Sequence, residues 1–225
     1  YVVSPITSQG QTNLKFLLSG LGYTISLSLI AIVISVLVGL AVALPGLAKN
    51  RTGRIFNRLY VETFRSIPPL VMILWIYYGL PVLLNIDIDV FASGILALAL
   101  CDSAFEAEIF RAGIQSIHRG QHEAADSIGL NYFNKMRYII LPQAIRRILP
   151  PLGNQFVYML KMSSLVSVIG LADLTRQANE LGVTEYRPLE IYTILVLEYL
   201  ILIVIASNLV RKLESYMGSD ENIAN

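Results

Sequence analysis

The sequence is poor in charged residues and in cysteine. Asp, Glu, Lys and Arg together make up 15% of the 225 residues, and the formal net charge at pH 7 is +1. A balance so close to zero excludes a broadly basic surface, so we expect no nucleic-acid partner. The single cysteine, Cys101, excludes an internal disulfide framework.

Catalytic motifs are also missing. The sequence contains no G-x-x-x-x-G-K-[ST] phosphate loop, so we do not expect the chain to hydrolyse ATP by itself. Its serines, histidines and carboxylates do not combine into a hydrolase site. His118 and His122 stand four residues apart, but two histidines without a nearby cysteine are more typical of a solvated helix face than of a metal site. We predict that the chain is not an enzyme and binds no metal or cofactor of its own.

Apolar residues dominate instead, making up 55% of the chain, and the mean hydropathy is +0.60. No charged residue lies between Lys15 and Lys49, a run far longer than the about 20 residues that cross a bilayer core. A second charge-free run covers residues 66–86. We predict an all-α integral membrane protein that forms one domain, 1–225. Its five transmembrane helices are expected at about 17–46, 60–84, 91–112, 143–171 and 189–212.

Small residues recur along the first predicted span. Ser35, Gly39 and Ala43 fall four positions apart and therefore share one helix face. Such a stripe lets a second helix approach closely, so we expect it to pack inside the helix bundle.

Basic residues gather at one end of the predicted spans. Thirteen of the 17 Lys and Arg flank the first connection, the central loop 114–142 or the end of the last span. They are Lys49, Arg51, Arg54, Arg58, Arg65, Arg111, Arg119, Lys135, Arg137, Arg146, Arg147, Arg211 and Lys212. Because such residues are retained on the cytoplasmic side, we predict the central loop and C-terminus inside and the N-terminus outside. The connections at 85–89 and 173–188 would then lie outside. The first thirteen residues show no signal-peptide pattern, so we expect none.

The central loop contains a short polar helix. Residues 123–126 read Glu-Ala-Ala-Asp, and Gly129, which readily takes the left-handed conformation that closes a helix, follows shortly after. The two alanines carry little side chain, so this helix could press into a groove on another protein. Glu123 and Asp126 could meet hydrogen-bond donors at the rim of that groove.

Two carboxylates lie inside the third predicted span. Asp102 and Glu106 share a helix face, and Asp102 lies close to the predicted bilayer midplane. Charged groups at that depth are energetically costly, so each is expected to have a partner or a function. They could pair with a cation such as Lys161, or they could line a polar cavity on the substrate path. Glu198 in the last span is an alternative partner for Lys161.

A third carboxylate, Glu108, lies nearer the membrane boundary. It stands three residues before Arg111, a spacing that places both on one helix face. We expect a local ion pair, with a role of Glu108 on the substrate path as the alternative.

The fourth predicted span contains two sets of helix-disturbing residues. The pair at 150–151, Pro-Pro, predicts a bend. Further on, Lys161 sits in an apolar run and is followed by Ser163, Ser164 and a renewed apolar segment. This order predicts a broken helix, with the serines as N-caps of a second half that points its N–H groups at a substrate carboxylate. Alternatively, the serines hydrogen-bond back to an unbroken helix.

These motifs resemble those of binding-protein-dependent ABC importer permeases. Residues 123–125, Gly129 and the Ile-Ile-Leu-Pro at 139–142 are similar to the signature loop of that family. The stretches 62–68, 107–114 and 141–156 are similar to its polar amino-acid branch. The resemblance implies a type I importer permease fold, in which the loop is a cytoplasmic coupling helix that seats in a cleft of an ATPase subunit. The coupling residues that it implies are Glu123, Ala124, Ala125, Asp126, Gly129, Leu141 and Pro142.

The resemblance also implies partners. These are two ABC subunits that hold ATP and Mg, an external amino-acid-binding protein or fused binding domain, and a second permease subunit, identical or not. The chain would lie in the lipid of a bacterial inner membrane. One departure is Met162, which follows Lys161 where family members commonly carry an acidic or polar residue.

The expected substrates are basic or neutral polar amino acids such as arginine, lysine, histidine or glutamine, because Asp102 and Glu106 would favour cationic groups. Two other classes of function stay open. A secondary transporter driven by an ion gradient could use the same two carboxylates, and a non-transporting scaffold could use the loop only to dock a partner.

Overall fold

The computed structural model describes residues 3, 6–48 and 50–218; Lys49, counted above among the flanking basic residues, lies outside this part. The described residues form helices joined by short turns. In order, the elements are α1 (Ser8–Ser19), α2 (Leu21–Leu47), α3 (Arg51–Ser66), α4 (Pro69–Leu74), η1 (Trp75–Gly79), α5 (Leu80–Leu84), α6 (Val90–Gln115), α7 (Arg119–Ser127), α8 (Tyr132–Lys135), η2 (Met136–Ile140), α9 (Leu141–Met162), η3 (Ser163–Ile169), α10 (Leu174–Glu185) and α11 (Pro188–Gly218).

Three helical stretches are long and apolar enough to cross a membrane, namely Ser8–Leu47, Val90–Gln115 and Pro188–Tyr216. Two bent pairs of helices raise this number to five if each pair is one span. One pair is Arg51–Ser66 with Pro69–Leu84, bent by 95°, and the other is Tyr132–Ile169 with Leu174–Glu185, bent by 49°. The five spans therefore stay a prediction, with two of them bent.

The second predicted span, 60–84, contains a break between two helices that the sequence interpretation did not expect. The segment after residue 49, where the first connection with its basic residues was expected, is the start of α3. Asn50 caps this helix by accepting a hydrogen bond from the Thr52 N–H at 3.0 Å. The chain then turns at Ile67 and Pro68, whose ψ angles are 123° and 134°. A residue that precedes proline is pushed out of the helical region, so the two prolines place the 95° bend inside the predicted span.

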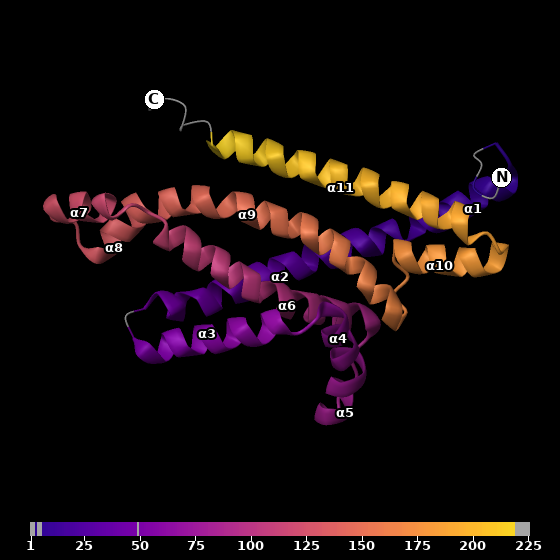
Figure 1. Cartoon of the computed structure of the whole chain (residues 1–225), viewed down its shortest axis with the longest axis horizontal. Coiled ribbons are helices and arrows are strands. Elements are labelled where there is room, and N and C mark those ends of the chain that lie inside the picture. The colour runs from indigo at the N-terminus through magenta and orange to yellow at the C-terminus, as the bar shows by residue number, and fades with distance from the viewer. Residues whose placement is uncertain (1–2, 4–5, 49, 219–225) are drawn as a thin grey trace.

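The centre of the bundle is the packing of α2 along α6 (Figure 1). A Cβ on Gly39 would lie 2.5 Å from Glu106 Cβ and 2.9 Å from the Ser103 carbonyl oxygen. Ser35 and Ala43 on the same face are fully buried. The small-residue stripe is thus a contact surface between two helices, which confirms the packing predicted from its spacing.

Two prolines are each preceded by a π-helical turn. At Pro81 and at Pro142 the residue just before the proline donates its N–H to a carbonyl five residues back, Leu80 to Trp75 and Leu141 to Met136. Proline has no N–H to continue the ladder, and the wider turn absorbs the mismatch. At the pair 150–151, α9 continues as one helix to Met162, and the expected bend there stays a prediction.

The start of α1 and the C-terminal end of α11 lie at opposite ends of the bundle, and α7 lies at the same end as the α2–α3 connection (Figure 1). The expected polar connection 173–188 is mostly the helix α10. Leu17, Leu181 and Ile191 bury this helix against α1 and α11. Asp173 caps it by accepting from the Arg176 N–H at 2.8 Å. The sequence interpretation did not recognise α10 as a helix because its apolar residues are interspersed with polar ones.

Candidate functional site

The polar loop forms a short helix, α7, held at its start by local contacts. His118 is its N-cap and accepts a hydrogen bond from the Gly120 N–H at Nδ1, at 3.1 Å. The next residue, Arg119, pairs with Glu123 one turn further on, at 3.0 Å between Nε and Oε1. His118 therefore has a structural role, since its imidazole satisfies one of the free N–H groups of the first turn.

Gly129 closes α7 as the sequence predicted. Its φ is +76°, in the left-handed region. The Leu130 N–H donates to the Ala125 carbonyl at 3.1 Å, and the Gly129 N–H donates to the Asp126 carbonyl at 3.0 Å. These two bonds form a Schellman motif, the common way to satisfy the last carbonyls of a helix. A Cβ on Gly129 would meet nothing within 4 Å, so backbone conformation and not space selects glycine there.

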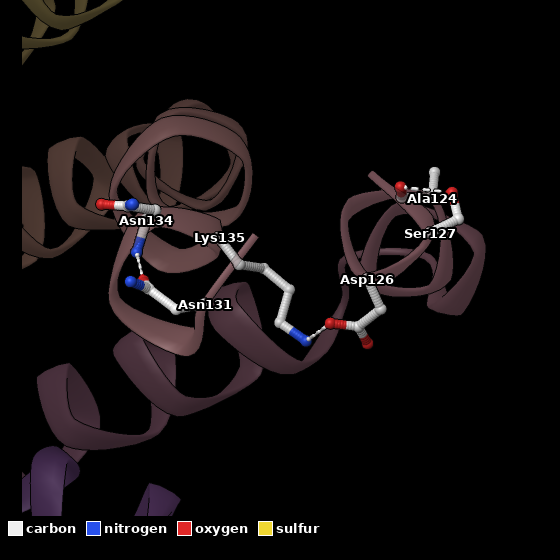
Figure 2. A network of polar contacts seen from close by, with 6 residues as sticks. All are labelled: Ala124, Asp126, Ser127, Asn131, Asn134 and Lys135. Carbon is white, nitrogen blue, oxygen red and sulfur yellow. Dashed lines mark hydrogen bonds and ion pairs between the residues drawn. The ribbon is translucent and has the colours of Figure 1, made fainter. Parts of the chain in front are cut away.

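Behind α7 the chain folds back through α8. The Asn131 side chain caps α8 by accepting from the Asn134 N–H at 2.9 Å, and the Lys135 ammonium reaches across to the Asp126 carboxylate at 2.6 Å (Figure 2). The Lys135 side chain is only 13% exposed. Glu123 and Asp126, expected to await donors on another protein, are therefore both paired within this chain.

Several apolar side chains are exposed at this end. Ala124 is exposed, whereas Ala125 is fully buried. Ile128, Tyr132 and Phe133 are 71%, 75% and 67% exposed. The sequence interpretation treated the two alanines alike and overlooked the three larger residues. Their apolar character within a polar loop, on either side of Gly129, was the available signal.

The loop is fastened to the transmembrane helix that follows it. Gln143 on α9 donates to the Gln121 side chain at 3.2 Å, and Arg147 donates to the Ser116 carbonyl at 2.7 Å. Leu141 and Pro142 open α9 directly after the turn η2. Beneath them, the apolar side chains Ile117, Ile140, Ala144 and Ile148 pack in one cluster. A displacement of α7 would therefore act directly on α9 and on the end of α6.

Asp102 and Glu106 point into the bundle and do not pair with Lys161. The Asp102 carboxylate accepts from the Ser35 hydroxyl at 2.7 Å and from the Gln155 amide at 2.9 Å, and its residue is 4% exposed. Glu106 is fully buried beside Gly39, and neither of its carboxylate oxygens accepts a hydrogen bond from a donor in the described part of the chain. Asp102 borders a small cavity of about 20 Å³.

The expected pair of Glu108 with Arg111 is wrong. Glu108 pairs with Arg65 of α3, and the Arg65 guanidinium also lies 5.0 Å from the centre of the Phe105 ring. Arg111 donates instead to the Gln115 side chain at 2.9 Å. Residues three apart on a helix can meet, but α3 packs beside α6 and offers Glu108 a second partner that the linear spacing could not reveal.

The predicted N-caps at Ser163 and Ser164 are also wrong. Their hydroxyls donate to the Leu160 and Lys161 carbonyls, each at 2.8 Å, and no side chain caps the start of η3. The helix tightens to a 3₁₀ form at Ser163 and runs on to Ile169, which corresponds to the alternative of serines bonded to their own helix.

Lys161 is exposed and not buried, and it borders an open cavity of about 470 Å³ with Ser164 and Tyr199. Among the described residues it forms no ion pair with Glu198, whose carboxylate oxygens are buried without a hydrogen-bond partner there. Lys161 therefore pairs with none of the three carboxylates expected as its partners, Asp102, Glu106 and Glu198.

Known proteins match nearly the whole chain. Residues 31–218 match the family model described as binding-protein-dependent transport system inner membrane component. The chain is 36% identical to a glutamine transport system permease protein of Escherichia coli K12, over 91% of the chain and 94% of that protein. It is 33% identical to an arginine transport system permease protein of Bacillus subtilis 168, over 92% and 95%.

Two solved structures are also similar. A chain from the crystal structure of an amino acid ABC transporter with histidines is 42% identical, with a TM-score of 0.85, over 90% of this chain and 94% of that one. A chain of the MetNI methionine ABC transporter in an inward-facing conformation is 18% identical, with a TM-score of 0.76, over 90% and 96%. The latter likeness shows the fold alone, which confirms the predicted importer-permease fold.

Proposed function

Because the chain belongs to the family of binding-protein-dependent transport system inner membrane components, and is thus an ABC importer permease and not a secondary transporter, we propose that it takes up polar amino acids. The named substrates of its relatives, glutamine and arginine, support this class. Within it we favour basic or neutral polar amino acids. The family implies an ATP-binding partner and a binding protein. We propose two ATPase subunits that hold ATP and Mg, an external binding protein or fused domain, and a second permease subunit.

We place the α7 end of the bundle in the cytoplasm and the start of α1 outside. The positions of the basic residues support this orientation. Arg51 begins α3, Arg119 begins α7 and Arg137 directly follows α8. The α2–α3 connection, α7 and α8 lie at the same end of the bundle (Figure 1). In this orientation α7 is accessible to a cytoplasmic ATPase.

The observation that carries the proposed coupling role is the construction of α7. It is a small helix with an outward face formed by Ala124 and Ile128, closed by Gly129 and joined to α9 through Gln143. Such a face lets the backbone of α7 come close to a groove on the ATPase. The contact between α7 and α9 would then transmit movement of α7 to the spans. Closure of the ATPase pair would then displace α7 and alternate the access of the pore.

The test is ATP-driven uptake of radiolabelled arginine and glutamine into proteoliposomes that hold the assembled transporter. Ala124→Phe should obstruct docking, and Gly129→Val should disturb the end of α7, because β-branched residues disfavour a positive φ. Both should abolish uptake and substrate-stimulated ATPase activity while the subunit remains inserted.

Matched controls separate coupling from general damage. Gly22→Val makes the same exchange at a helical position where a Cβ meets nothing within 4 Å, and Thr184→Phe introduces a phenylalanine at an exposed position of α10. Both should retain uptake. Normal uptake and ATPase stimulation in both α7 variants would contradict the coupling role.

The roles of the buried carboxylates need a separate measurement. Uptake of arginine, glutamine and glutamate by Asp102→Asn and Glu106→Gln variants distinguishes a path from a structural role. Selective loss of arginine uptake would support the path. Unchanged selectivity would assign both to structure, as their contacts with α2 favour.

A further inference from the structure

A large cavity lies between α3 and the ends of α2 and α6, with a volume of about 610 Å³. It is separate from the Asp102 region, whose hollow has entirely different lining residues. Its lining consists of Gly46, Arg51, Arg54, Ile55, Asn57, Arg58, Val61, Glu62, Glu108, Arg111 and Gln115. The cavity therefore lies toward the end of the bundle that carries α7 (Figure 1).

The inner wall of this cavity is built by a fixed helix contact. The Asn57 side chain, 8% exposed, donates to the Val42 carbonyl at 2.9 Å. A Cβ on Gly46 would lie 2.7 Å from Asn57 Cγ, so α2 and α3 meet closely at this point. Val61, one turn further along, is also buried. The arginines thus stand on a helix whose position is set by packing.

The charge around the cavity is predominantly positive. Four arginines line it, but only two glutamates do, and one of these, Glu108, already pairs with Arg65 outside the lining. The other, Glu62, faces Arg58 at 3.7 Å in an exposed pair. Arg51 and Arg54 form no ion pair with any residue in the described part of the chain. Several guanidinium groups are therefore left to attract an anion.

Exposed apolar side chains flank the arginines on the same helix. Ile55, Phe56 and Leu59 are 49%, 54% and 60% exposed, and Ile55 also lines the cavity. Positions 55 and 59 share one helix face, next to the face of Arg51, Arg54 and Arg58. A ligand that joins a negative group to hydrocarbon would satisfy both faces at once.

We propose that this cavity binds the phosphate headgroup of an anionic membrane lipid, with the acyl chains against the apolar face of α3. The proposal rests on the orientation in the proposed function, which places the cavity at the cytoplasmic leaflet. Basic pockets between transmembrane helices on that side are suited to anionic headgroups. Arg51 and Arg54 hold the phosphate, and Arg58 and Arg111 bound the cavity.

The experiment is lipid binding by native mass spectrometry on the full chain in detergent, with phosphatidylglycerol and phosphatidylcholine titrated separately. Phosphatidylglycerol should bind more tightly. The double variant R51Q/R54Q should weaken its binding by roughly 25-fold, at about fivefold for each arginine removed. R51K/R54K retains both charges and should bind almost as wild type does. Because no ATP or amino acid is present, the result does not depend on coupling or on transport.

A charge-matched control tests for non-specific attraction. R176Q/R187Q removes two arginines from the other end of the bundle and should leave phosphatidylglycerol binding unchanged. Equal losses in both double variants, or equal binding of the two lipids, would overturn the proposal. So would arginine-dependent binding of inorganic phosphate without lipid binding, or an R51Q/R54Q variant that binds lipid normally and loses only its ATPase partner.

Discussion

The close contact between α2 and α6 at Gly39 makes a quantitative prediction. In Gly39→Ala the new Cβ would lie 2.5 Å from Glu106 Cβ, 2.9 Å from the Ser103 carbonyl oxygen and 3.0 Å from the Ala107 N. Two of these atoms belong to the α6 backbone and cannot rotate away. Normal carbon contacts are about 3.5–4.0 Å, so α2 and α6 must separate by about 1 Å.

The expected cost follows from two opposing effects. Overpacking a tight contact costs about 1–3 kcal/mol, whereas replacing glycine by alanine inside a helix gains about 1 kcal/mol. The net loss is about 0–2 kcal/mol, which corresponds to a decrease of up to roughly 8 °C in the melting temperature of a domain of this size.

The assay is thermal unfolding of the purified chain in detergent, compared with Gly22→Ala. The control makes the same exchange in α2, at a position where a Cβ meets nothing within 4 Å. Gly22→Ala should keep or raise the melting temperature. If Gly39→Ala melts as high as Gly22→Ala, the close approach of α2 and α6 is wrong.

Two further predictions concern the carboxylates of α6. Asp102→Ala should destabilise the chain by about 1–3 kcal/mol in thermal unfolding, and more than Asp102→Asn, because it removes the side chain that accepts from the Ser35 hydroxyl and the Gln155 amide. A double-mutant cycle should find a coupling energy of about 0.2–1 kcal/mol between Arg65 and Glu108, which are both partly exposed, and none between Glu108 and Arg111; the reverse would restore the local pair.

The local features of this protein could be predicted from sequence because short-range rules determine them. Gly129 ends α7 because no other residue so easily takes a positive φ, and its place three residues beyond Asp126 was readable. The small-residue stripe that contains Gly39 could also be predicted, because residues four apart always lie on one helix face. The family motifs added the importer-permease fold, which the comparisons confirm.

Contacts between helices distant in the sequence could not be predicted in this way. Glu108 had a suitable partner three residues away, yet α3 presents Arg65 to it once the bundle is packed. A cation partner was one of two roles left open for Asp102, but Ser35 and Gln155, both neutral, donate to it from two other helices. The prolines at 68–69 indicate the position of the 95° bend. The sequence interpretation gave more weight to the charge-free run around them and therefore predicted one continuous span.

Cross-linking at Ala124 tests most directly whether α7 is the element that meets the ATPase. The only cysteine, Cys101, is buried, so a Cys101→Ser background allows one photo-crosslinker to be attached to Ala124→Cys. We predict a crosslink to the ATPase subunit in the assembled transporter, and none from Thr184→Cys on α10. No crosslink from Ala124→Cys, or an equal crosslink from both positions, would contradict a coupling role of α7.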